Sequence, residues 1–128
     1  MNKNLIIIAD DTEPLRRLQK RILQKFSEFK IEEFDSGTSL RNRLEDNVDS
    51  IALVITDNDM PGMKGSEIIR EYSKRQGFEE IPFILHYAGD EQIGKQAVID
   101  GAFDYLMKPG NVSDYTRLIE RALSHFKR

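Results

Sequence analysis

The chain has 128 residues, the usual size of one compact domain, and we expect a single domain over residues 1–128. Charged residues make up 32% of the sequence and apolar residues 39%, which favours a globular fold over a disordered one. The net charge of -3 comes without a dense basic patch, so we expect no direct contact with nucleic acid or membrane. The sequence contains no cysteine, which excludes disulfides and cysteine-bound zinc. No apolar run could span a bilayer and no signal peptide is visible, so we expect a cytoplasmic protein.

Short apolar runs rich in Ile, Val and Leu alternate with segments of helical period. The apolar runs predict five strands, at residues 5–9, 31–34, 51–56, 81–87 and 103–107. The periodic segments predict five helices, through residues 15–29, 37–44, 65–76, 90–100 and from 112 to the chain end at about Phe126. Thr12 and Pro14 are suited to a helix start, and Gly77 and Gly101 to helix ends. Strict alternation of this kind predicts an α/β fold, a doubly wound parallel sheet with right-handed crossovers.

Charged side chains follow three of the predicted strands, at the point where each strand ends. Asp10 and Asp11 follow the first strand, Asp57 follows the third, and Lys108-Pro109 follows the fifth. Parallel strands in neighbouring positions bring their carboxyl ends to one edge of the sheet, which is where open α/β sheets bind ligands. Three carboxylates and one ammonium at that edge suit a hard divalent cation and a phosphoryl group.

Each of these residues also has a purely structural interpretation. An Asp pair before a helix is most often a capping device, and a Lys-Pro is an ordinary turn. A third carboxylate beside the pair argues against a purely structural role, because three neighbouring carboxylates repel one another unless a cation is present. Asp57 is then the candidate nucleophile, since a carboxylate can attack phosphorus and form an aspartyl-phosphate. Lys108 would balance the charge on the phosphoryl oxygens.

The same residues in this order resemble the response-regulator receiver domain of two-component signalling. The resemblance covers residues 5 to about 126 and rests on the acidic pair, on Asp57 followed by Met60-Pro61-Gly62, and on Lys108-Pro109. It implies a flavodoxin-like, five-stranded sheet of strand order 2-1-3-4-5 with five helices.

The resemblance also implies roles for individual residues. Asp11 and Asp57 would ligate Mg²⁺ directly, Asp10 mainly through water, and Asp59 through its backbone carbonyl. Lys108-Pro109 would be a cis peptide, and the backbone N–H of Ala88 would contact the phosphoryl group. A histidine kinase would be the phosphodonor, with the domain catalysing its own phosphorylation and slow hydrolysis without being a metabolic enzyme. A downstream protein, an output domain or a second copy would dock on the fourth helix, fifth strand and fifth helix, including Lys95 and Tyr105.

One position departs from the family pattern. The family has Ser or Thr at the end of the fourth strand, where this chain has Tyr87. We expect the phenol either to cover part of the pocket or to point outward, and in both cases to impair the family's switch. Tyr105 matches an aromatic residue that moves between outward and inward positions in the family, and it would need space that Tyr87 fills.

Two alternatives remain at this point. Tyr87 is compatible with a degenerate receiver, an interaction module that never switches by phosphorylation. Asp57-Asn58-Asp59 also matches the Asp-x-Asp of haloacid-dehalogenase-type phosphatases, although that motif belongs at a first strand and such enzymes need room for a cap.

Overall fold

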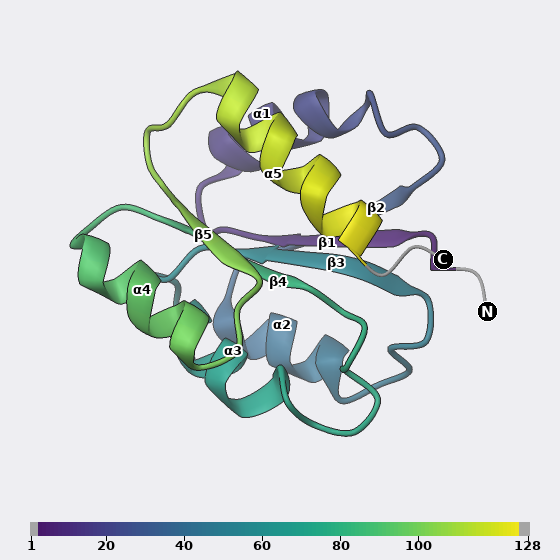
Figure 1. Cartoon of the computed structure of the whole chain (residues 1–128), viewed down its shortest axis with the longest axis vertical. Coiled ribbons are helices and arrows are strands. Elements are labelled where there is room, and N and C mark those ends of the chain that lie inside the picture. The colour runs from purple at the N-terminus through teal and green to yellow at the C-terminus, as the bar shows by residue number, and fades with distance from the viewer. Residues whose placement is uncertain (1–2, 126–128) are drawn as a thin grey trace.

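The computed structural model describes residues 3–125 (Figure 1), in which five strands alternate with five helices. The strands are β1 (Leu5–Ala9), β2 (Lys30–Phe34), β3 (Ile51–Thr56), β4 (Phe83–Tyr87) and β5 (Asp104–Met107). The helices are α1 (Glu13–Leu23), α2 (Gly37–Leu44), α3 (Gly65–Tyr72), α4 (Glu91–Ile99) and α5 (Val112–His125). Phe126, expected near the end of the last helix, lies outside the described residues.

All four strand pairings are parallel, and the strand order is β2-β1-β3-β4-β5. This confirms the predicted flavodoxin-like, doubly wound sheet. The order places β1 and β3 side by side at the centre of the sheet and β4 and β5 beyond β3. The carboxyl ends of these strands therefore share one edge, where the loops carrying the charged residues meet.

The helices cover both faces of the sheet: α1 and α5 lie on one face, and α2, α3 and α4 on the other (Figure 1). Alternation along the strands divides the buried side chains into two cores. Ile6 and Ile8 of β1 pack in the core under α1 and α5. Leu5 and Ile7 of the same strand pack in the core under the other three helices. Both faces of the central strands are buried, which explains their continuous apolar runs.

Helix starts follow the expected capping chemistry in part. Ser36 Oγ accepts a hydrogen bond from Ser39 N at 3.0 Å, and Asp90 Oδ1 accepts one from Gln92 N at 3.0 Å. Thr12 precedes α1 but makes no side-chain capping bond. Its own N–H instead donates to Asp10 Oδ1 at 2.9 Å, so that the first of the acidic pair shapes the turn into α1.

Several element ends differ from the predicted ones. β4 begins at Phe83 and not at residue 81, since Pro82 has no N–H to donate to a neighbouring strand. α3 ends at Tyr72, before Gly77, because the residues between them form successive tight turns with bonds such as Arg75 N to Tyr72 O at 3.0 Å. Gly77 and Gly101 adopt positive φ angles of 96° and 122° in the turns that follow α3 and α4.

Among residues 3–125, no helix combines the length and apolarity needed to cross a bilayer.

Candidate functional site

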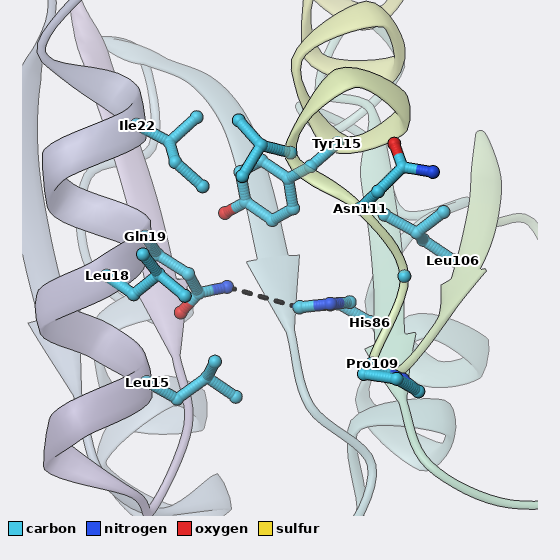
Figure 2. Close-up of a pocket in the computed structure, with 11 residues that line it drawn as sticks. Leu15, Leu18, Gln19, Ile22, His86, Leu106, Pro109, Asn111 and Tyr115 are labelled. Atoms are coloured by element: carbon cyan, nitrogen blue, oxygen red, sulfur yellow. Dashed lines mark hydrogen bonds between the residues drawn. The ribbon is translucent and has the colours of Figure 1, made fainter.

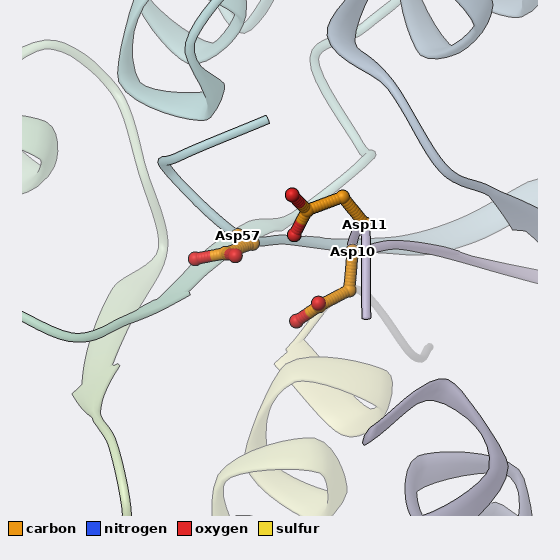
Figure 3. Close-up of side chains that lie close together, drawn as sticks. All are labelled: Asp10, Asp11 and Asp57. Atoms are coloured by element: carbon orange, nitrogen blue, oxygen red, sulfur yellow. The ribbon is translucent and has the colours of Figure 1, made fainter. Parts of the chain in front are cut away.

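Three carboxylates converge at the carboxyl edge of the sheet, as the strand order predicts. Asp10 and Asp11 follow β1, Asp57 follows β3, and one oxygen of each lies within 4.8 Å of the others (Figure 3). Asp10 and Asp57 are buried, with 1% and 7% exposure, whereas Asp11 is exposed to solvent. The cluster therefore has one open side.

Lys108 brings an ammonium group into this cluster from the end of β5. Its Nζ lies 2.8 Å from Asp10 Oδ2 and 3.3 Å from Asp57 Oδ2, so one cation bridges two buried carboxylates. The Lys108–Pro109 peptide bond is cis. The Lys108 N–H also donates to the carbonyl of Tyr87 at 2.6 Å, which joins the end of β5 to the end of β4.

The surroundings of Asp57 act on its charge in opposite directions. Burial raises the pKa of the Asp57 carboxyl above its ordinary value, and the neighbouring Asp10 carboxylate raises it further. The Lys108 ammonium lowers the Asp57 pKa, as does the hydrogen bond from Asn58 N to Asp57 Oδ1 at 2.7 Å. Burial is the largest of these effects, so a nearby positive charge in addition to Lys108 would favour the ionised, nucleophilic form.

Arg16 of α1 holds the chain where the acidic pair begins, a role that sequence reasoning missed. Its Nη1 donates to the backbone carbonyl of Asp10 at 2.5 Å, and its Nε pairs with Glu33 of β2 at 3.1 Å. The hydrogen bond from Lys20 and the contacts with Arg16 lower the pKa of the Glu33 carboxyl. No motif in the sequence distinguishes Arg16 from the other basic residues of α1.

Gly65, the first residue of α3, allows a close approach of the backbone to Asp57. A Cβ atom at this position would lie 2.0 Å from the carbonyl oxygen of Asp57. The same carbonyl accepts a hydrogen bond from Thr56 Oγ1 at 2.8 Å. The signal in the sequence was the pair of glycines in the loop after Asp57, which indicated a turn but not its contact.

The Tyr87 ring takes neither of the two expected positions. The ring neither covers the carboxylate cluster nor points outward, because it is fully buried on the face of the sheet that α4 covers. Alternation along β4 gives the physical reason, since Tyr87 faces the same way as Phe83 and Leu85. Its hydroxyl donates to the Asp90 carbonyl at 2.6 Å and accepts from Gly94 N at 2.9 Å.

Two other predicted residues lie on the rim. Ala88 follows Tyr87 and is exposed, and Asp59 is exposed in the loop after β3. The carboxylate of Asp59 does not join the cluster of Asp10, Asp11 and Asp57. The predicted roles of Ala88 and Asp59 belong to their main-chain atoms and stay predictions.

A small cavity of about 90 Å³ lies beside the site, between α1, the end of β4 and the start of α5 (Figure 2). At its base Gln19 Nε2 lies 3.3 Å from His86 Nδ1, and both side chains are buried. Gln19 Oε1 and the Tyr115 hydroxyl make no hydrogen bond of normal geometry among the described residues. None of the carboxylates of the cluster lines this cavity, so it is separate from the acidic site.

Comparison with known proteins agrees with this geometry. Residues 6–120 match the family described as the response regulator receiver domain. The chain belongs to this family. The match covers most of the chain, and the structure places Asp57 after the third strand and not after the first, where the phosphatase motif belongs.

Individual proteins match over 90% or more of the chain. The two-component response regulator ARR15 of Arabidopsis thaliana is 30% identical over 90% of this chain and 60% of its own length. The DNA-binding transcriptional regulator NtrC of Escherichia coli is 28% identical over 99% of this chain but only 26% of its own length. A crystal structure of a receiver domain protein from Clostridium thermocellum superposes with a TM-score of 0.84 at 29% identity, covering 97% of both chains. The chain thus spans between about a quarter and three fifths of the length of these two curated relatives.

The donor set of the site fits a divalent cation. Receiver domains generally bind Mg²⁺ at an acidic pocket, and Asp10, Asp11 and Asp57 form such a group here. Carboxylate oxygens are the ligands that this hard cation prefers, and exposed Asp11 leaves an open side for water and a phosphate oxygen.

Proposed function

We propose that this receiver domain accepts a phosphoryl group on Asp57, with a histidine kinase as donor and Mg²⁺ as cofactor. One observation supports this most directly: one oxygen of the Asp57 carboxylate lies within 4.8 Å of oxygens of Asp10 and Asp11, and Lys108 Nζ lies 3.3 Å from Asp57 Oδ2. In the reaction an Asp57 oxygen forms the new O–P bond while the P–N bond of the donor's phosphohistidine breaks. The leaving imidazole keeps the bonding electron pair.

The remaining site residues support this step by charge and position. Asp10, Asp11, Asp57 and the Asp59 carbonyl would hold Mg²⁺, which supplies positive charge to the transferred phosphoryl group when bound. Lys108 is placed to stabilise the negative charge on the phosphoryl oxygens, because its ammonium already contacts the Asp57 carboxylate. Arg16 and Gly65 keep the main chain of Asp10 and Asp57 in place.

We further propose that phosphorylation changes the affinity of this domain for a downstream partner in the cytoplasm. The proposed docking surface consists of α4, β5 and α5, with Lys95 and Tyr105, and it would take a protein, an output domain or a second copy of the chain. Exposed apolar side chains lie on these elements, among them Val98, Ile99 and Met107.

A second function, an interaction module independent of phosphorylation, is favoured by one observation. The Tyr87 side chain is buried under α4 and directed away from the carboxylates, so it gives the phosphoryl group no hydroxyl. Against this function, the carboxylates of Asp10 and Asp57 are buried beside the Lys108 ammonium at the sheet edge, and burial of charge is costly.

Intact-mass analysis tests the phosphoacceptor function. After incubation with Mg²⁺ and acetyl phosphate, we expect one labile adduct of phosphate mass on the parent protein. The adduct should be absent in Asp57→Asn, strongly reduced in Lys108→Ala and retained in Asp59→Asn, whose side chain lies outside the cluster. A parent protein without an adduct would favour the interaction module, and an adduct in Asp57→Asn would assign the chemistry to another residue.

A further inference from the structure

The Tyr87 hydroxyl is inserted into the first turn of α4. It donates to the carbonyl of Asp90, the residue that precedes the helix, at 2.6 Å and accepts from the N–H of Gly94, four residues further on, at 2.9 Å. These two backbone groups are the pair that closes the first turn of a regular α-helix. In α4 the hydroxyl bridges them.

The other four helices show the regular arrangement. In each of them the carbonyl of the residue before the helix accepts directly from the N–H four residues later, at 3.0 to 3.1 Å. The pairs are Arg16 with Thr12, Leu40 with Ser36, Ile68 with Lys64 and Tyr115 with Asn111. In α4 the Asp90 carbonyl accepts from Ile93 N at 3.1 Å and from the Tyr87 hydroxyl. The position of the first turn of α4 thus depends on a side chain of β4.

Tyr105 packs against the outer side of the same turn. A Cβ atom on Gly94 would lie 2.2 Å from the ring of Tyr105, so the ring rests directly on the helix backbone. The hydroxyl of Tyr105 donates to Glu91 Oε2, 3.0 Å away, and its ring centre lies 6.4 Å from that of Tyr87. Tyr87 occupies the buried space on the inner side of Tyr105 with no exposed surface.

We propose that Tyr87 is a clamp that holds the first turn of α4 and keeps the Tyr105 ring on the outer side of that turn, with its hydroxyl at Glu91. Its ring fills the interior behind Tyr105, and its hydroxyl ties β4 to the backbone of α4. Interiors are close-packed, so Tyr105 cannot move inward unless Tyr87 leaves. The surface formed by α4 and β5 therefore has the same shape whatever the state of Asp57.

This clamp goes beyond the proposed phosphoacceptor function. If Asp57 is phosphorylated as proposed, the clamp also limits where a downstream partner can detect the phosphoryl group. A partner on the proposed docking surface of α4, β5 and α5 therefore distinguishes phosphorylated from unphosphorylated protein only where it also contacts the loops after β3 and β4 at the site itself. Docking on α4 and Tyr105 alone would not report the state of Asp57.

Hydrogen exchange of the Gly94 amide tests the clamp without any ligand. In Tyr87→Phe the ring remains and only the hydroxyl is lost, so we expect the Gly94 amide to exchange about tenfold faster or more. Tyr115→Phe is the matched control, because it removes one oxygen from another buried tyrosine that makes no normal hydrogen bond. Equal Gly94 exchange in the parent and in Tyr87→Phe would overturn the clamp.

A second measurement follows the Tyr105 ring signals by NMR when Mg²⁺ and beryllofluoride are added. In the parent we expect shifts of the backbone amides around Asp57 with little shift of the Tyr105 ring. In Tyr87→Thr, which empties the space behind Tyr105, the ring signals should shift clearly more. Equal Tyr105 shifts in the two proteins would overturn the clamp. If Mg²⁺ and beryllofluoride shift the amides around Asp57 in neither protein, the proposed phosphoacceptor function is wrong. The clamp is then still tested by the hydrogen exchange of the Gly94 amide.

Discussion

At the scale of single residues, His86 shows how a buried titratable group can lie beside the site without belonging to the cluster. It is 5% exposed, and its Nδ1 lies 3.3 Å from the amide nitrogen of Gln19. Burial is the main reason that the pKa of His86 is lowered to about 4. The Lys108 ammonium also lowers this pKa, and the Asp10 carboxylate raises it. The ring of Tyr115 packs against it at 5.3 Å between centres. The imidazole is therefore neutral in the folded protein at neutral pH.

The lowered pKa of His86 predicts a loss of stability in mild acid. Between about pH 6.5 and 4 the unfolded chain binds a proton at this residue and the folded chain does not, so the free energy of unfolding falls as the pH falls. The loss attributable to His86 should reach roughly 2 to 3 kcal/mol near pH 4. Urea unfolding from pH 7 to 4.5 should show a shallower decline of the unfolding free energy in His86→Gln than in the parent. Identical slopes in His86→Gln and the parent would contradict this assignment.

At the scale of elements, α3 begins at Gly65, which lies against the backbone of Asp57 at the end of β3. We expect Gly65→Ala to destabilise the fold by roughly 2 to 3 kcal/mol, because a Cβ atom 2.0 Å from the Asp57 carbonyl forces backbone to move. Gly77→Ala is the matched comparison, because nothing lies within 4 Å of the added Cβ atom. Only the positive φ of 96° is unfavourable for alanine, and we expect a loss of about 1 kcal/mol of unfolding free energy. Chemical denaturation measures the unfolding free energy of both variants. Gly65→Ala should also lower the yield of the Asp57 adduct, whereas Gly77→Ala should not, and equal effects would argue against the close approach at Asp57.

The elements also show where sequence reasoning ends. Apolar runs and helical periods located every strand and helix, since burial on one or both faces of the sheet dictates those patterns. Alternation along β4 predicts that Tyr87 shares a face with Phe83 and Leu85, whereas the family resemblance implies a side chain beside the phosphoryl group at this position. That its hydroxyl enters a helix turn depends on how α4 sits against β4, which no local pattern contains.

At the scale of the whole molecule, the topology brings residues nearly a hundred positions apart into contact. Asp10 and Lys108 meet at 2.8 Å because β1, β3, β4 and β5 share one carboxyl edge. This convergence could be predicted from the alternation of strands and helices once the strand order was taken from the family resemblance. The support that Arg16 gives to the Asp10 carbonyl could not, because it depends on the rotation of α1 over the sheet.

Cation binding at this edge should therefore stabilise the fold as a whole. Mg²⁺ relieves repulsion among carboxylates that exist together only in the folded protein, and we expect affinity in the millimolar range or weaker. At a concentration tenfold above its dissociation constant, binding to the folded state alone adds about 1.4 kcal/mol. Thermal unfolding of the parent should shift upward by a few degrees with Mg²⁺. The shift should be much smaller in Asp57→Asn, which removes a charged ligand, and unchanged in Asp59→Asn, whose proposed ligand is a backbone carbonyl. A full shift in Asp57→Asn would mean that Mg²⁺ stabilises the protein elsewhere on its surface.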